Sequence, residues 1–82
     1  MLKIIMTEEE ILRLLKTCRT LYLKIYNVED YRFTSVELAC LIELRELLNI
    51  GLLNRTELFA TVGITVEEIV YLIGVYSTIK KP

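Results

Sequence analysis

Residues 53–69 read LNRTELFATVGITVEEI and contain the same local pattern twice: an apolar residue, Thr or Asn, two residues of any kind, Glu and a second apolar residue. The pattern is that of a capping box inside a hydrophobic staple. The Thr or Asn oxygen accepts a backbone N–H of the first helical turn, and the Glu accepts the N–H of the cap residue. Two further copies lie earlier in the chain. The four copies are Met6-Thr7 to Glu10-Ile11, Phe33-Thr34 to Glu37-Leu38, Leu53-Asn54 to Glu57-Leu58 and Ile64-Thr65 to Glu68-Ile69.

Each copy predicts the start of a helix, and apolar residues recur at intervals of three and four after it. Gly51 and Gly63 stand where left-handed residues commonly end helices. No strand or repeat pattern occurs, so the sequence predicts a single all-α domain over residues 1–82. The predicted helices span residues 8–26, 35–49, 55–62 and 66–78. Helix 35–49 is apolar around most of its circumference, which predicts that it is the central helix.

Bulky apolar residues are unusually frequent in this chain. Leu, Ile, Val and Phe account for 33 of the 82 residues, whereas Ala occurs only twice. A domain of this size buries only about 60–65% of its unfolded surface, so one small core is not expected to cover all of them. The composition therefore favours a homo-oligomer, most simply a dimer, or another protein partner.

Several classes of protein are disfavoured. No run approaches the roughly 20 apolar residues of a membrane span, and the first residues do not resemble a signal peptide, so a cytoplasmic protein is expected. The chain has no His, no Gly-rich phosphate loop and no Cys beside a base. The sequence therefore predicts no enzyme, no metal site and no cofactor. Scarce amide side chains, with Gln absent, together with abundant Glu, Ile and Leu favour a thermophilic source.

The two cysteines and the basic residues each have two interpretations. Cys18 and Cys40 are interpreted as small buried residues, and the alternative is a bridge between the first two helices. The net charge is −1, yet the stretch from Arg13 to Lys24 contains bases and no acid. The candidate contacts for phosphate or an acidic partner are Arg13, Lys16, Arg19, Lys24, Arg55 and Thr56. The alternative is an ordinary solvated helix face.

Residues 41–76 resemble the three-helix core of helix-turn-helix and winged-helix DNA-binding domains. The matching segments are ELRELLNIGLL (43–53), NRTELFATVGIT (54–65) and VEEIVYLIGVY (66–76), with Glu57-Leu58 and Gly63-Ile64-Thr65 at matching spacings. The resemblance implies a tight turn at Gly63 and a DNA-binding regulator as one possible function. It also implies buried positions for Val62, Ile64, Ile69 and Leu72.

Three features depart from that family. Phe59 stands where the family usually has a small residue, and no β wing is expected after helix 66–78. Reading of bases in the major groove needs donors such as Arg, Lys, Asn or Gln. The positions that would face the groove carry none of these donors. They are Thr65, Val66, Glu67, Val70 and Tyr71. A base-reading recognition helix is therefore not expected.

Helix 66–78 carries apolar residues outside its expected buried stripe, which predicts a second buried side. Gly74 permits the close approach of another helix. The predicted protein interface comprises Val66, Val70, Tyr71, Gly74 and Val75. The alternative is that helix 8–26 covers this surface within the same chain. The sequence thus predicts a small regulatory or adaptor protein that acts through protein contacts as a homodimer, and a DNA-binding regulator is the alternative.

Overall fold

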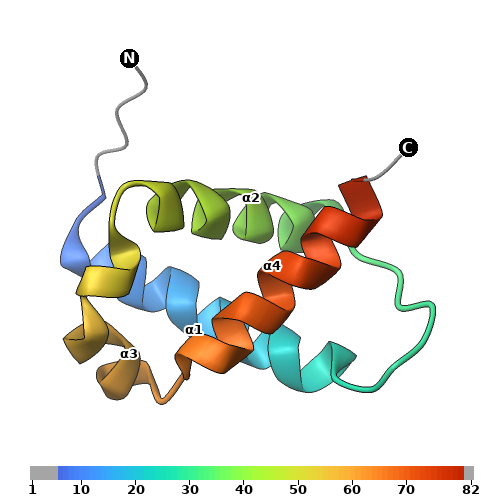
Figure 1. Ribbon diagram of the computed structural model, residues 1–82, viewed down its shortest axis with the longest axis horizontal. Helices are drawn as coiled ribbons and strands as arrows, with labels where there is room; N and C mark the ends of the chain where they lie inside the picture. Colours follow the sequence, from blue (N-terminus) through green and yellow to red (C-terminus); the bar gives the residue numbers. More distant parts are fainter. Residues whose placement is uncertain (1–5, 81–82) are drawn as a thin grey trace.

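The computed structural model describes residues 6–80 (Figure 1). The elements are α1 (Glu8–Ile25), α2 (Ser35–Asn49), a single 3₁₀ turn η1 (Leu52–Asn54), α3 (Thr56–Val62) and α4 (Val66–Lys80). No strand occurs between residues 6 and 80. The predicted all-α fold with four α-helices is confirmed.

Three of the four predicted capping boxes are present. They begin α1, α2 and α4, with Thr7, Thr34 and Thr65 as the cap residues. In each box the Thr hydroxyl accepts the N–H of the Glu three residues later at 3.1 Å. The Glu carboxylate accepts the N–H of the Thr at 2.9–3.0 Å. The two bonds satisfy backbone donors that the first helical turn leaves without partners.

The third capping box, at Asn54, is wrong. Gly51 has a left-handed φ of 107° and directs the chain into η1, in which the Asn54 N–H donates to the Gly51 carbonyl at 3.0 Å. Arg55 is the N-cap of α3, and its side chain makes no capping bond. Glu57 accepts a hydrogen bond from Arg55 instead of reaching back to residue 54. As a result α3 begins at residue 56 and not at 55.

The predicted ends of two other helices also need correction. Helix α1 ends at Ile25 instead of residue 26, because Tyr26 leaves the helix with φ −60° and ψ 123°. Helix α4 continues to Lys80 instead of residue 78, since neither Gly nor Pro interrupts residues 75–80. The bounds of α2 are as predicted.

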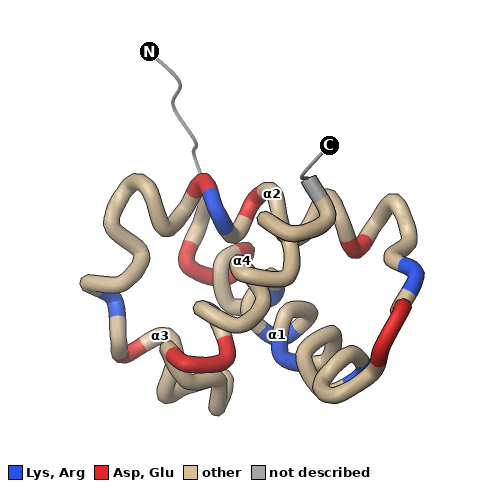
Figure 2. Tube along the Cα trace, turned by 45° about the vertical axis from the view of Figure 1, so that its right-hand side comes forward, with Lys and Arg blue, Asp and Glu red and all other residues tan. Residues whose placement is uncertain are grey.

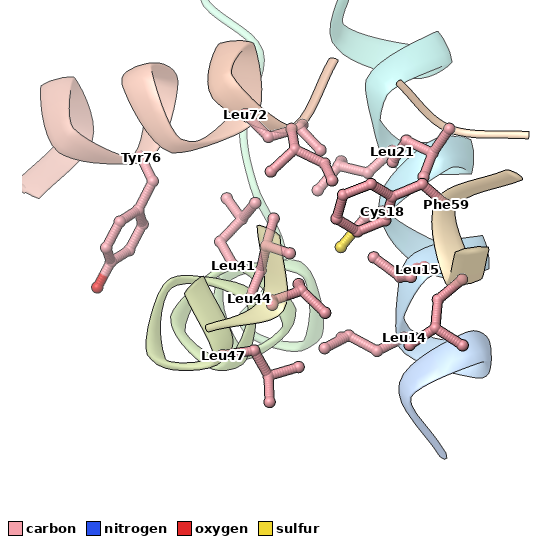
Figure 3. Packing of buried hydrophobic residues seen from close by; sticks show 14 of the residues in the cluster. Leu14, Leu15, Cys18, Leu21, Leu41, Leu44, Leu47, Phe59, Leu72 and Tyr76 are labelled. Atoms are coloured by element: carbon pink, nitrogen blue, oxygen red, sulfur yellow. The ribbon is translucent and has the colours of Figure 1, made fainter. Parts of the chain in front are cut away.

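The molecule is two helix layers thick. Its shortest extent is 19 Å, close to two helix diameters of about 10 Å. Helix α4 runs diagonally across the front of the molecule, with α1 behind it and α2 along one edge (Figure 1). Helix α1 packs against α2, α3 and α4. Side chains from all four helices meet in one core, among them Cys18, Leu44, Phe59 and Leu72 (Figure 3).

The prediction that helix 35–49 is the central helix is wrong. Only Leu41, Leu44 and Leu47 of α2 are buried, whereas five residues of α1 are. Val36 in the first turn of α2 and Ile42 on the side opposite its buried residues are exposed to solvent. Because α2 lies at the edge of the molecule, the rest of the chain covers only part of its apolar surface.

The connection from α3 to α4 is a tight turn of three residues, Gly63 to Thr65. Gly63 has a left-handed φ of 86°, and the N–H groups of Gly63 and Ile64 both donate to the Phe59 carbonyl. The chain direction changes by 93° between the two helices. Phe59 is buried, and α3 packs mainly against α1. Phe59, which is wider than the small residue usual at this position in helix-turn-helix domains, therefore lies in the core and not in a close crossing with α4.

No single helix in residues 6–80 is both long and apolar enough to cross a membrane. Helices α3 and α4 reach that length and apolarity only together, across their 93° bend.

Candidate functional site

Three of the five predicted interface residues share the solvent side of α4. Ile69, Leu72 and Tyr76 form the buried side of this helix. Val66, Val70 and Gly74 recur at intervals of four residues along its exposed side, and we call them the α4 outer surface. Val70 is 60% exposed and Val66 is 40% exposed. Among the described residues, a Cβ atom placed on Gly74 would meet no atom within 4 Å apart from its chain neighbours and the adjacent backbone of α4.

The other two predicted interface residues lie on a side of α4 that the same chain partly covers. Tyr71 and Val75 are half-buried and pack against the core. The Tyr71 ring lies 5.4 Å from the ring of Tyr22 and 5.6 Å from that of Tyr26, measured between centroids. Helix α1 therefore covers one flank of α4 within the same chain, as the alternative interpretation expects, and leaves the α4 outer surface open.

The neighbouring end of α1 adds exposed apolar residues that the sequence-based prediction missed. Leu23 is 62% exposed, and half of Tyr26 is accessible. Tyr26 contacts Tyr71, the residue after Val70, so Tyr26 lies beside α4. Burial among these rings raises the pKa of the Tyr22 phenol. One signal for Leu23 was present in the sequence, since this apolar residue lies outside the apolar stripe of its helix.

Arg19, a predicted phosphate contact, instead secures the turn between α3 and α4. Its guanidinium donates to the Gly63 carbonyl. The Nε atom lies 4.0 Å from Glu68 Oε1, an oxygen that also accepts the Thr65 N–H. The side chain therefore ties α1 to the turn and to the first residues of α4, and its charge faces an acid within the chain.

Lys24 belongs to a network around Glu37. The Lys24 Nζ lies 3.3 Å from Glu37 Oε2, and the Tyr31 hydroxyl donates to the same oxygen at 2.8 Å. The backbone N–H of Thr34, together with Tyr31 and Lys24, lowers the pKa of the Glu37 carboxyl. The hydrogen bond to Glu37 raises the pKa of Lys24. The network connects α1 to the first turn of α2.

Arg55 is also paired with acids. Its Nη2 atom lies 2.6 Å from Glu8 Oε2 and its Nε atom 2.5 Å from Glu57 Oε2. The hydrogen bonds to Glu57 and Glu8 raise the pKa of Arg55, and the bond from Arg55 lowers that of Glu57. Arg55 thus joins the start of α3 to the start of α1, and Thr56 beside it is exposed.

Arg13 and Lys16 are the remaining predicted phosphate contacts, and both are exposed on α1. Arg13 lines a shallow cavity of about 430 Å³ together with Glu10 and Glu43, so acids share its surface. The six predicted phosphate contacts therefore do not gather into one basic patch. In Figure 2 the acids at the first turn of α4 are followed by a long stretch without charge.

The cysteines are free thiols. Cys18 is fully buried and Cys40 is half-buried. Burial raises the pKa of the Cys18 thiol to about 12, and it also raises that of Cys40. Within residues 6–80, no group of three or more His, Cys, Asp or Glu side chains is arranged to hold a metal ion.

Comparisons with protein families, with curated proteins and with solved structures gave no match for this chain.

Proposed function

We propose that this chain is a small regulatory or adaptor protein that acts through protein contacts and forms a homodimer through the α4 outer surface. The observation that carries the proposal is the exposure of Val66 and Val70 beside an unobstructed Gly74. Glycine inside a helix costs about 1 kcal/mol relative to alanine. No atom of another helix in residues 6–80 lies within 4 Å of a Cβ at this position, so the close approach of a helix from a second molecule would give Gly74 a physical role.

A second copy of the same chain is the simplest partner for the α4 outer surface, since two-fold dimers are the commonest oligomers. An antiparallel pairing of the two α4 helices about Gly74 suits the charges. Glu67 precedes Gly74 by seven residues, which places the two Glu67 side chains about 20 Å apart across the axis. A parallel pairing would bring the acids of both first turns together. It would also align the two helix dipoles.

Disulfide trapping tests this arrangement. In a chain carrying Cys18→Ala and Cys40→Ser, single cysteines are introduced as Gly74→Cys, Val66→Cys or Ile50→Cys. A disulfide needs Cα atoms within about 7 Å of each other. Gly74→Cys is expected to form a covalent dimer under mild oxidation, because the axis passes through this position. Val66→Cys is expected to stay monomeric, since its two copies lie about 24 Å apart.

Two outcomes of the trapping experiment contradict the proposal. Equal rates of dimer formation at Ile50→Cys and Gly74→Cys indicate random collision. Trapping at Val66→Cys together with Gly74→Cys indicates a parallel pair.

The second candidate function is a DNA-binding regulator, and the α3–α4 turn favours it. Helix-turn-helix motifs join two helices at about 90–120° through a short turn that often contains Gly. The 93° bend, the turn at Gly63 and the burial of Ile64, Ile69 and Leu72 support the likeness. Val62, the fourth position expected to be buried, is half-buried. The α4 outer surface lacks base-reading donors, however, and Arg19, Lys24 and Arg55 are paired with acids. We therefore place this function second.

Fluorescence anisotropy of a labelled DNA duplex separates the two functions. The adaptor proposal predicts no binding at low salt. DNA binding that weakens steeply with salt would instead support the second candidate. Lys16→Glu would then reduce the affinity, because Lys16 is an exposed cation on α1.

A further inference from the structure

A second feature of the surface lies beneath the connection between α1 and α2. A cavity of about 350 Å³ opens there between residues 26–34 and the C-terminal half of α4. Its walls include Val28, Tyr31 and Phe33 from the connection, and Tyr71 and Val75 from α4. The rings of Tyr31 and Phe33 meet edge to face, with centroids 4.9 Å apart. The walls are thus mainly apolar and aromatic.

Among the described residues that line this cavity, Asp30 is the one with a charged side chain. Asp30 has a left-handed φ of 60°, and Asn27 three residues earlier has a φ of 63°. Asp and Asn adopt this conformation more readily than other residues with a side chain. The hydroxyl of Tyr31 donates to Glu37, so the phenol is already engaged on the α2 side. The Thr78 hydroxyl, also in the lining, donates to the Gly74 carbonyl, so the charge of the described lining is the single negative charge of Asp30.

We propose that this cavity binds a small amphiphilic amine, with an apolar or aromatic body and one cationic head. Ligand pockets in proteins have volumes of about 300–1,000 Å³, with apolar walls and a few polar groups that fix orientation. Aromatic faces attract cations, and Asp30 supplies the opposite charge to an ammonium group. An anionic ligand of the same shape meets repulsion from Asp30 and finds no cation among the described residues of the lining.

An NMR titration of the full chain tests this proposal with three probes that share a phenyl body. Phenethylamine is cationic, phenethyl alcohol is neutral and phenylacetate is anionic. Phenethylamine is expected to shift the amide signals of residues 28–33 and 71–79 in a saturable manner. Phenethyl alcohol is expected to bind more weakly, and phenylacetate is expected to cause no saturable shift.

The variant Asp30→Asn removes the charge and keeps a residue that tolerates the left-handed conformation. It is expected to weaken the binding of phenethylamine by about three- to tenfold and to leave phenethyl alcohol unaffected. Glu29→Gln is the matched control, because Glu29 belongs to the same connection but does not line the cavity. Its affinity for phenethylamine is expected to equal that of the wild type.

Three results would overturn the proposal: no saturable shift with phenethylamine, equal binding of phenylacetate, or equal losses in Asp30→Asn and Glu29→Gln. The mass of the protein in solution, measured in the same samples, shows whether the chain is a monomer or a dimer independently of ligand binding. A failure of the ligand site is thereby distinguished from a failure of the proposed dimer.

Discussion

At the scale of single residues, Glu37 connects more segments than any other acid in residues 6–80. Its carboxylate accepts the Thr34 N–H at the start of α2, the Tyr31 hydroxyl of the connection and a hydrogen bond from Lys24 of α1. These bonds favour the ionised form, so the pKa of Glu37 lies below its ordinary value of 4.5.

The pH dependence of stability follows from this pKa. The unfolded state binds the proton of Glu37 more tightly than the folded state does. The stabilisation is therefore complete above pH 4.5 and is lost as the pH falls through the lower pKa of the folded state. Glu37→Gln preserves an acceptor for the cap, and it is expected to flatten the decline of stability below pH 4.5. Urea unfolding at a series of pH values measures this slope, and an unchanged slope contradicts the assignment.

Glu37→Ala removes the charge and every acceptor together. It leaves the half-buried Tyr31 hydroxyl and the Thr34 N–H without their partner. We expect it to cost about 1–3 kcal/mol at neutral pH, more than Glu37→Gln. Equal stabilities of the two variants would show that the hydrogen bonds contribute nothing.

The two thiols are expected to react at different rates. The Cys18 thiol is fully buried and its pKa is about 12, whereas Cys40 is half-buried at the edge of a cavity. A thiol reagent at mildly alkaline pH should label Cys40 first and reach Cys18 only in denaturant, because the thiolate is the reactive form. The single variants Cys18→Ala and Cys40→Ser identify each site. Equal labelling of both thiols in the native protein contradicts the burial of Cys18.

Local sequence patterns determine most of the caps but not all of them. Thr7, Thr34 and Thr65 were predictable because a capping box is completed within four residues. Asn54 matches the same pattern, yet the left-handed Gly51 three residues before it starts a 3₁₀ turn that uses the Asn54 N–H. The pairing of Arg19 with Gly63 joins positions 44 residues apart, and no local pattern contains it.

At the scale of elements, Gly63 before α4 and Gly74 within it are expected to differ when replaced by alanine. The first substitution should lower the stability of the chain and the second should raise it. Gly63 has a φ of 86°, where a side chain costs about 1–2 kcal/mol, and a Cβ there lies 3.5 Å from Arg19 Nη1. Gly74 is helical with open space beside it, so Gly74→Ala should stabilise the single chain by about 0.5–1 kcal/mol. Urea unfolding at protein concentrations below the association range measures both. Destabilisation by Gly74→Ala would show that the chain itself needs this glycine.

The positions and types of the helices were predictable, whereas their neighbours were not. Periodicity identified the buried side of α1, including Leu15 and Cys18, since a repeat of three and four residues defines one face. The apolar circumference of α2 suggested a central helix, but Val36 and Ile42 are exposed. Periodicity shows which residues avoid water and does not show whether this chain or another molecule covers them.

At the scale of the whole molecule, the surface residues decide the proposed function. Five cations of the sequence were candidate phosphate contacts, and three of them are paired with acids from distant segments. The apolar residues on the outside of α4, by contrast, have open space beside Gly74. This contrast favours a protein partner over a nucleic acid. The sequence identified the α4 surface, but only the fold separates Val70 from the half-buried Tyr71.

Sedimentation equilibrium at micromolar protein tests the central claim that the α4 outer surface forms a homodimer. The wild type is expected to have twice the 9.6 kDa mass of one chain. Val70→Glu places a charge in the interface and should raise the dissociation constant by more than about tenfold. Ile50→Glu is the matched control, because Ile50 is 61% exposed at the end of α2, and it should remain dimeric. A monomeric wild type, or equal dissociation of the two variants, would contradict the claim.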